Sequence, residues 1–585
     1  MKLKRVFLTC LAAITLVGCA GCGAQDVSKG GKLAVYVRQA EEGYSDYKGQ
    51  SVHFAYSADG KTYTPIYHNY GLLFAKCSYS DENGIRSKGV VNPRIYKSGS
   101  KYIIAADEVA RIFIGEELVT ERTDKFVIWE TSDFISFSEA EVVNKLSYGE
   151  PISVPCVTEL HGAVNEVEID VSGDILKAVK DYYAPLEFVS VDYPKTFEIT
   201  SEADLDKLYA TVTYSDGSTH EKRIVLDTSK IDFSRAGKYK VEGKISALKM
   251  PFPLEERPWG DPVLTEWEGK YYFLGTNDWE TNNFEIRSAD TIEGLFNGNE
   301  QRAKILTDEG KKFSTFWAPE FHVINGKMYI FCALTPGEGW NPQAHVMELK
   351  EGGDMLNPDD WYEPRACVFP DGRVLGTDPL GTGKSGIGID MNYFEANGKG
   401  YVSWSYRTFW GEDSGSMILL AETDLDKPWQ LLSEPILLTR PEYGWENVDK
   451  TDNNEGPNTV VRDGKVYIVY SAGNAGGDSY ALGMLTADEN ADLLDINSWE
   501  KSKYPVLASD FVEGEIGCGH HSFYFGGDGN TYILYHGHKT FGNSERIDGM
   551  RRVQYLADGR PYVALSNEQD IPESEQNVRI TVVVK

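Results

Sequence analysis

Five ionisable side chains stand at nearly the same distance before a repeated turn in the second half of the chain. Each turn contains Gly and leads into an aromatic strand that begins at Tyr272, Tyr329, Tyr401, Tyr467 or Tyr532. The ionisable residues come 9 to 12 positions earlier, at Asp261, Glu320, Asp390, Glu455 and His520. Carboxylates and imidazole are the groups that most often transfer protons in enzymes. Their regular placement indicates a shared site with acid–base chemistry.

The elements that position these residues are predicted to be the blades of a β-propeller. Each turn, such as Asn325-Gly-Lys-Met-Tyr329, places Gly where a hairpin needs a positive φ. Successive turn tyrosines are 57, 72, 66 and 65 residues apart, which is enough for four strands and their loops. Five such units match a five-bladed propeller. Its innermost strands line one channel, where converging acids cost stability unless protonated or paired, so their convergence indicates function.

The motifs around these positions resemble glycoside hydrolase family 43 over residues 250 to 565. They occur in the family's order, as Gly260-Asp-Pro-Val-Leu264, Trp317-Ala-Pro-Glu320, Gly388-Ile-Asp-Met391, Asn454-Glu-Gly-Pro457 and Gly517-Cys-Gly-His520. The resemblance implies an inverting hydrolase in which Asp261 is the general base and Glu455 the general acid. It implies that Asp390 is the third carboxylate, which tunes the pKa of the acid and orients it. Inversion requires space for a water molecule between acid and base.

Four further residues are candidates for roles around these acids. Trp317 is interpreted as a platform for a sugar ring, with a core tryptophan as the alternative, and Glu320 as a supporting residue that does not react. His536 is a candidate substrate ligand, in a region that also contains His521 and His538. The resemblance implies that His520 lies beside an axial calcium ion; the alternative is a core histidine held by hydrogen bonds. No cofactor is expected for the chemistry itself.

The resemblance favours an α-L-arabinofuranosidase that removes terminal or side-chain pentosyl residues from plant polysaccharides. The stretch from Tyr480 to Val506 carries this preference. A β-xylosidase and an endo-arabinanase are the alternatives, since they share the acids and differ in the loops that shape their subsites. An alternative of another class is an inactive lipoprotein that binds glycans at the cell surface.

Charge limits the partners. The formal net charge is −31 and the pI is near 4.8. Nucleic acid is therefore not expected as a partner, because its binding depends on lysine and arginine neutralising phosphates. A polyanionic polysaccharide would also be repelled at long range. A neutral pentose-containing polysaccharide or oligosaccharide meets no such repulsion.

The first residues predict export. Lys2, Lys4 and Arg5 precede a short apolar run from Val6 to Val17, which is typical of a signal peptide. The run ends in Leu16-Val17-Gly18-Cys19, which resembles the lipobox of bacterial lipoproteins. We therefore expect residues 1–18 to be removed and a lipid on Cys19 to anchor an extracellular, cell-surface protein. Residues 19–32 would be the tether.

The whole chain is predicted to be all-β, with three parts after the tether. Residues 33–160 are expected to form a non-catalytic β domain like propeller blades, in which Asn92 replaces a base and cannot take a proton. Residues 161–185 are interpreted as a linker. Residues 186–248 resemble a bacterial immunoglobulin-like sandwich, because strands alternate with tight turns such as Ser215-Asp-Gly217. Residues 250–585 are expected to be the propeller.

Overall fold

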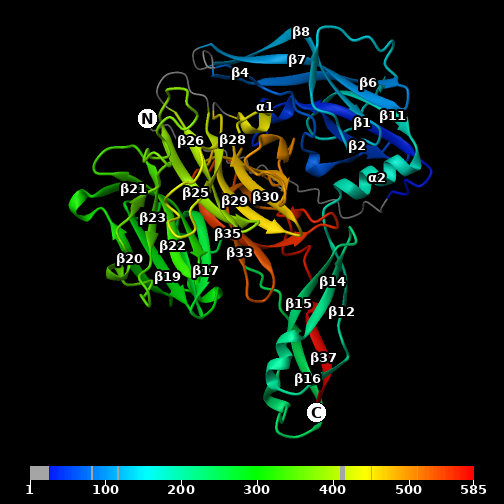
Figure 1. Ribbon diagram of the computed structural model, residues 1–585. Helices are drawn as coiled ribbons and strands as arrows, with labels where there is room; N and C mark the ends of the chain where they lie inside the picture. The colour runs from blue at the N-terminus through cyan, green and yellow to red at the C-terminus, as the bar shows by residue number, and fades with distance from the viewer. Residues whose placement is uncertain (1–24, 81–83, 115–116, 409–414, 449–450, 510) are drawn as a thin grey trace, which may run out of the picture.

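The protein is described from a computed structural model, which covers residues 25–585 except 81–83, 115–116, 409–414, 449–450 and 510. It consists of an N-terminal β domain, a small elongated β domain and a propeller (Figure 1). The expected signal peptide, Cys19 and the first part of the tether lie outside the described residues.

The propeller has five antiparallel blades, and in each one the strands follow the order of the sequence. Blades 1 and 2 comprise β17 (Gly260–Trp267), β18 (Lys270–Thr276), β19 (Asn283–Ala289), β20 (Gln301–Thr307), then β21 (Phe313–Ile324), β22 (Lys327–Pro336), β23 (Gln343–Glu348) and β24 (Arg365–Ala366). Blades 3 and 4 comprise β25 (Ile387–Ala396), β26 (Lys399–Arg407), β27 (Met417–Thr423), β28 (Ile436–Thr439), then β29 (Asn454–Arg462), β30 (Lys465–Ala472), β31 (Ala481–Asp488) and β32 (Trp499–Lys501). Blade 5 comprises β33 (Ile516–Phe525), β34 (Thr531–His538), β35 (Ile547–Tyr555) and β36 (Pro561–Tyr562).

The innermost strands close a ring, which confirms the predicted fold class. Strand β17 contacts β21 and β33, and the remaining neighbours β21–β25, β25–β29 and β29–β33 also touch. The repeated turns join the first and second strand of each blade. In blade 2, Asn325 and Gly326 have φ values of 49° and 75°. Two consecutive positive φ values define the hairpin turn that matches the twist of the strands.

The described part of the N-terminal domain contains two larger sheets, a short hairpin and two α-helices. The first sheet has the order β10 (Val154–Pro155), β11 (Ala163–Val171), β1 (Gly31–Arg38), β2 (His53–Ser57), β3 (Thr64–Pro65). The second comprises β6 (Lys88–Ser98), β7 (Lys101–Ile114), β8 (Glu117–Thr131) and β9 (Glu141–Val143). The hairpin β4 (Ser78–Ser80) and β5 (Gly84–Arg86), and the short helix α1 (Asp46–Gly49), lie toward the propeller.

Residues 161–185 do not form the expected linker. They form β11 and the helix α2 (Gly173–Tyr183), whose Leu176 and Val179 are fully buried in the core of the N-terminal domain. Ser172 caps the helix by accepting a hydrogen bond from the Ile175 main chain. Within the described part of the chain, no helix has the length and apolar character needed to span a bilayer.

The small domain is a curled sheet of six strands around its own core. In spatial order these are β12 (Phe188–Asp192), β14 (Tyr209–Tyr214), β15 (Thr219–Leu226), β16 (Gly237–Ile245), β37 (Asn577–Val584) and β13 (Thr196–Ile199). Strand β37 was expected within the propeller region 250–585, but it pairs antiparallel with β16 and parallel with β13. Its buried Val578, Ile580, Val582 and Val584 alternate with less buried residues, so one face completes the core of the small domain.

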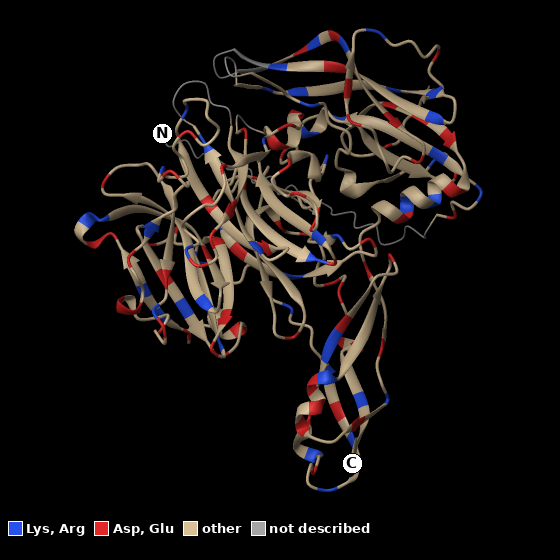
Figure 2. Cartoon of the chain, in the orientation of Figure 1, with Lys and Arg blue, Asp and Glu red and all other residues tan. Residues whose placement is uncertain are grey.

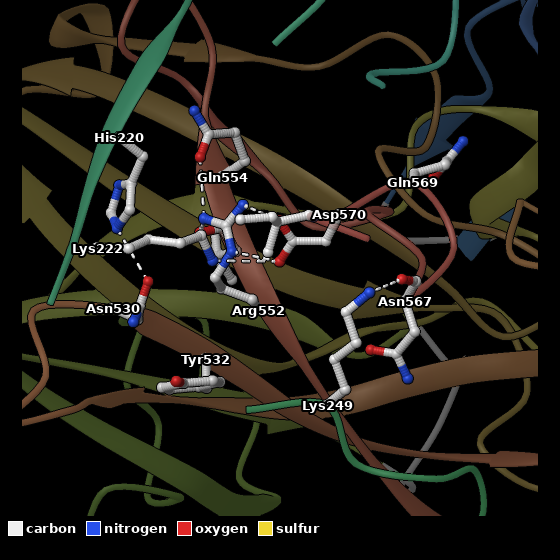
Figure 3. A network of polar contacts seen from close by, with 12 residues as sticks. His220, Lys222, Lys249, Asn530, Tyr532, Arg552, Gln554, Asn567, Gln569 and Asp570 are labelled. Carbon is white, nitrogen blue, oxygen red and sulfur yellow. Dashed lines mark hydrogen bonds and ion pairs between the residues drawn. The ribbon is translucent and has the colours of Figure 1, made fainter. Parts of the chain in front are cut away.

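A buried network of polar side chains joins the small domain to blade 5 (Figure 3). The Arg552 guanidinium donates to Asp570 at 2.7 Å, and Tyr214 also donates to this carboxylate. The ammonium group of Lys222, fully buried, lies 3.4 Å from Asp570. Burial and the neighbouring Arg552 charge lower the pKa of Lys222 to about 7. Asp570 is therefore the counter-charge for two buried cations.

We expect Asp570→Asn to destabilise this junction strongly. The substitution leaves Arg552 and Lys222 buried without their anion, a change that costs about 3–5 kcal/mol in comparable sites. Urea unfolding followed by tryptophan fluorescence measures the loss. Asp558→Asn is the matched control, because Asp558 pairs with Arg560 through a half-exposed side chain and should change stability by less than about 1 kcal/mol. Equal effects of the two variants would contradict the assignment.

Candidate active site

A β-bulge interrupts the innermost strand of every blade at the position of its ionisable residue. The register shifts fall at Gly260/Val263, Trp317/Glu320, Ile389/Asn392, Glu455/Asn458 and Gly519/Ser522. Asp261, Asp390 and His520 have left-handed φ values of 55°, 54° and 41°. Such backbone costs on the order of 1–3 kcal/mol per residue. The bulges re-aim these side chains, and the contacts below show that they turn toward one another.

Asp261 is buried and surrounded by cations and donors. Its Oδ1 lies 2.8 Å from Arg546 Nη1 and 3.2 Å from His520 Nδ1. Its Oδ2 accepts a hydrogen bond from the Thr276 hydroxyl at 2.5 Å. Burial opposes ionisation, but Arg546, His520 and His536 outweigh it and hold the pKa of Asp261 well below its usual range. Asp261 is therefore an ionised carboxylate at neutral pH.

His520 lies within the field of all three predicted catalytic acids. Its main-chain N–H donates to Ser471 Oγ at 2.8 Å, which fixes the bulge. Burial alone would lower the pKa of the imidazole, but the negative charges of Asp261, Asp390 and Glu455 raise it above its ordinary value. Three acids from three blades therefore act on one buried ring.

Asp390 and Glu455 approach each other through Gly456. The Gly456 main-chain N–H donates to Asp390 Oδ2 at 3.3 Å, and a Cβ at Gly456 would lie 3.2 Å from the His520 ring. Burial raises the pKa of Asp390 to about 6, and the charge of Glu455 adds to the shift. The half-buried Glu455 accepts a hydrogen bond from the Tyr480 hydroxyl at 2.8 Å.

Glu320 lies beside this group, with Nε2 of His322 from the same strand 3.9 Å from one of its oxygens; burial lowers the pKa of His322 to about 3, so this neighbour is neutral. Asn458 donates to both of its oxygens, at 2.9 and 3.1 Å. Burial, reinforced by the charges of Asp390 and Asp261, raises the pKa of Glu320 to about 8. Glu320 is thus protonated at neutral pH, which fits a supporting role for this residue.

We expect Glu320→Gln to stabilise the protein at high pH. Between pH 4.5 and about 8, Glu320 keeps its proton in the folded protein but loses it in the unfolded chain. Ionisation therefore favours the unfolded chain, and the free energy of unfolding falls progressively as pH rises through this range. The neutral amide removes that cost, a gain on the order of 2–4 kcal/mol at pH 8 and close to none at pH 4. Thermal melting across this range measures it.

The exposed Glu309→Gln is the control for this experiment. Glu309 lies in a turn on the surface, so its substitution should leave the melting temperature unchanged at every pH. A gain from Glu320→Gln that did not grow with pH would contradict the raised pKa.

The other predicted site residues are placed as follows. Trp317 is not a core residue: 36% of it is exposed, and its ring centroid is 6.4 Å from that of Trp340. His536 is fully buried behind Asp261 and stacks on Tyr480. Its Nδ1 lies 3.2 Å from the main-chain N of Asp261 and its Nε2 lies 3.2 Å from the Ala475 carbonyl. Both nitrogens are used within the protein, which leaves neither for a sugar.

The donors around His520 do not fit a calcium site. Among residues whose placement is described, no group of three or more His, Cys, Asp or Glu side chains is arranged to hold a metal ion. Calcium takes six to eight oxygen ligands, whereas Nδ1 of His520 faces Asp261, and the same carboxylate oxygen is engaged by Arg546. We derive no step that uses a metal.

Two residues of the site were not singled out from the sequence. Arg546 donates to Asp261 and, through two nitrogens, to both oxygens of Asp278 at 2.8 Å. It lies in a loop before β35, outside the repeated phase of the blades. Tyr480 occurs in a motif that resembles the family, but its hydrogen bond to Glu455 needs the fold. In the sequence, Arg546 and Tyr480 could have been selected as candidates only by considering every aromatic or basic residue near the ends of the predicted strands.

Charge elsewhere on the molecule is mixed. Figure 2 shows acidic and basic residues interspersed along the strands and loops. A cavity of about 620 Å³ lies away from the acids, where the three parts of the chain meet; it is lined among others by Tyr67, Tyr182, Tyr504 and Arg560. This cavity does not contain the predicted acids, so the candidate site is placed at the acids, whose pKa values perturb one another.

Five blades around a cluster of buried acids and a histidine define a propeller with an acid–base site at its centre. The family model "Glycosyl hydrolases family 43" matches residues 252–561, more than half of the chain. The chain belongs to this family.

Its relatives include characterised enzymes. "Alpha-L-arabinofuranosidase B" of Pyricularia oryzae is 30% identical over 330 residues, which cover 55% of this chain and 63% of that protein. An "Extracellular exo-alpha-(1->5)-L-arabinofuranosidase" of Streptomyces chartreusis is 31% identical over 302 residues, 51% of this chain and 86% of that protein. A solved α-L-arabinofuranosidase from Lactobacillus brevis is 30% identical, with a TM-score of 0.46 over 54% of this chain and 95% of that one. The chain thus spans less than two thirds of the Pyricularia relative.

Proposed function

We propose that this protein is an inverting glycoside hydrolase that releases terminal or side-chain α-L-arabinofuranosyl residues from plant polysaccharides. The observation that carries the proposal is that residues of separate blades meet at His520: Asp261 Oδ1 lies 3.2 Å from its Nδ1, and Gly456, which follows Glu455 and donates to Asp390, would place a Cβ 3.2 Å from its ring. Acids from separate blades that crowd one ring cost stability, so their arrangement is better explained by chemistry than by folding.

Asp261 is proposed as the general base. A base must be ionised before it can take a proton from water, and Arg546 and His520 favour that state in Asp261. The same neighbours hold the carboxylate in place, because Thr276 and Arg546 engage its two oxygens separately. The attacking water would lie against Asp261, on the face of the sugar opposite the leaving oxygen.

Glu455 is proposed as the general acid, with Asp390 as the residue that tunes and orients it. Asp390 accepts a hydrogen bond from Gly456, the residue next to Glu455. An acid that keeps its proton while the base has lost its own is the division of roles that inversion needs.

The preference for arabinofuranose rests on the relatives, since two of them carry that activity in their names. A β-xylosidase and an endo-arabinanase are alternatives within the family, and a glycan-binding protein without catalysis is the alternative class. Incubating the full chain with 4-nitrophenyl α-L-arabinofuranoside and 4-nitrophenyl β-D-xylopyranoside tests them. Faster release from the arabinoside supports the proposal, faster release from the xyloside favours a xylosidase, and no release from either by folded protein favours the binder.

We also propose that the protein is exported and anchored at the cell surface by a lipid on Cys19. The signal-like first residues support this, and two Streptomyces relatives are named extracellular. The small domain, whose strands resemble an immunoglobulin-like sandwich, would then be a spacer. Metabolic labelling with a fatty acid tests the anchor: absence of label from protein that carries an intact Cys19 would reject it.

A further inference from the structure

The N-terminal domain touches a propeller loop that is directly connected to the acids. Gly43, with a φ of 72°, lies in the tight turn closed by Glu41 and Tyr44. A Cβ at Gly43 would lie 2.1 Å from the Phe541 ring, so the turn packs directly on this aromatic side chain. Phe541 is half-buried, which leaves part of its ring accessible.

The loop that carries Phe541 connects to both sides of the acid cluster. The main-chain N–H of Gly542 lies 3.0 Å from each carboxylate oxygen of Asp478. Asp478 comes two residues before Tyr480, whose hydroxyl binds Glu455. At the end of the same loop, Arg546 binds Asp261. Phe541 therefore lies on a loop that is bound at one point to Asp478, two residues before the partner of Glu455, and at another to Asp261.

A second contact of the N-terminal domain reaches the segment that leads into Glu455. A Cβ at Gly415 would lie 3.0 Å from both Ile85 of the N-terminal hairpin and Asp452. Asp452 comes three residues before Glu455. The Cys77 main-chain N–H also donates to the Glu442 carbonyl at 2.7 Å. The second contact therefore comes close in sequence to Glu455 at Asp452, whereas the first reaches the site through the loop that carries Phe541.

We propose that the N-terminal domain completes the leaving-group side of the active site, and that Phe541 is a platform for the sugar beyond the scissile bond. The inference rests on the proposed function, in which Glu455 protonates the leaving oxygen. The leaving sugar must then lie on the Glu455 side, and Gly542, next to Phe541, donates to Asp478 in the segment that leads to Tyr480, the hydrogen-bond partner of Glu455. An aromatic face suits the apolar C–H surface of a neutral sugar. The ligand is the neutral pentose chain on that side.

The test compares two substrates with the full chain. Arabinotriose places a sugar on the leaving-group side, whereas methyl α-L-arabinofuranoside places only a methyl group there. Phe541→Leu keeps an apolar side chain in the loop but removes the ring. We expect it to lower the kcat/KM ratio of arabinotriose to methyl glycoside about three- to tenfold, which corresponds to the loss of one aromatic contact. Phe541→Tyr keeps the ring and should restore the ratio.

Gly43→Ala tests the contribution of the N-terminal domain. Its new methyl group would overlap with the Phe541 ring and must displace it, although the two residues are almost 500 positions apart in the sequence. The kcat/KM ratio of arabinotriose to methyl glycoside should therefore fall as it does in Phe541→Leu. Phe525→Ala is the matched control, because Phe525 is 57% exposed at the far end of β33. Circular dichroism and thermal melting verify that each variant is folded.

The outcomes separate this inference from the proposed function. An active wild-type protein whose ratio stays within twofold in both Phe541→Leu and Gly43→Ala overturns the inference alone, as does an equal fall in Phe525→Ala. A folded wild-type protein that releases arabinose from neither substrate overturns the proposed function and this inference with it.

Discussion

Glu455→Gln is expected to lower kcat for arabinotriose by about 10³-fold, within the range of 10² to 10⁴ that a proton-transfer group contributes. Glutamine keeps the size of the side chain and an oxygen that can accept the Tyr480 hydrogen bond, but it has no proton to give the leaving sugar. Initial rates of arabinose release by the purified full chain measure the loss.

The leaving group distinguishes an acid from a merely structural residue. 2,4-Dinitrophenolate departs without a proton, so with 2,4-dinitrophenyl α-L-arabinofuranoside the loss in Glu455→Gln should shrink to less than about tenfold. Glu500→Gln is the matched control: Glu500 is an exposed glutamate of the same blade and should change neither rate. Losses of equal size on the two substrates would show that Glu455 does not protonate the leaving oxygen.

Asp261→Asn is expected to lower kcat by about 10³- to 10⁴-fold on both substrates. Every substrate must be attacked by water, and an amide cannot accept the proton that the water loses. The fold should persist, because Arg546 keeps its two contacts with Asp278 when the charge of Asp261 is removed. Steady-state rates with arabinotriose and the dinitrophenyl glycoside measure the effect.

Asp278→Asn is the control for Asp261→Asn, because it alters the same arginine from the side away from the acids. We expect it to reduce kcat by less than about tenfold, since a positioning change costs less than loss of the base. Proton NMR of the first-formed sugar in the wild-type reaction should show the β-anomer, as inversion requires. An Asp261→Asn variant that hydrolyses the dinitrophenyl glycoside at a near-normal rate would remove Asp261 from the role of base.

The propeller could be predicted because its turns leave a local mark. A hairpin that needs two positive φ values selects Asn-Gly or a similar pair, as at Asn325 and Gly326, and the strand that follows has a buried Tyr as its second or third residue. The phase of the ionisable residues relative to these turns placed Asp261, Asp390 and Glu455 in different blades. Because the five innermost strands close into a circle, these acids come close to the imidazole of His520.

Other features depend on contacts that no local pattern encodes. Arg546 lies in a loop without a repeat, so only its ion pairs with Asp261 and Asp278 reveal its place in the site. The bulges have a partial signal: Asp261, Ala318 and Gly456 all precede a proline, which cannot donate to a strand ladder and is tolerated at bulges. Helix α2 and strand β37 could not be assigned to their domains, because apolar periodicity shows that a face is buried but not against which partner.

Strand β37 also affects how the circle of five blades is held closed. The last strand of blade 5 ends at Tyr562, and among the described residues no strand is exchanged between the first and the last blade. Instead the two polypeptide segments that leave the circle, at Ile245 and Asn577, run side by side as neighbours in the small domain. The small domain therefore holds together the two chain segments that flank the propeller. Because β37 follows all five blades along the chain, this domain can be completed only after the blades have been synthesised.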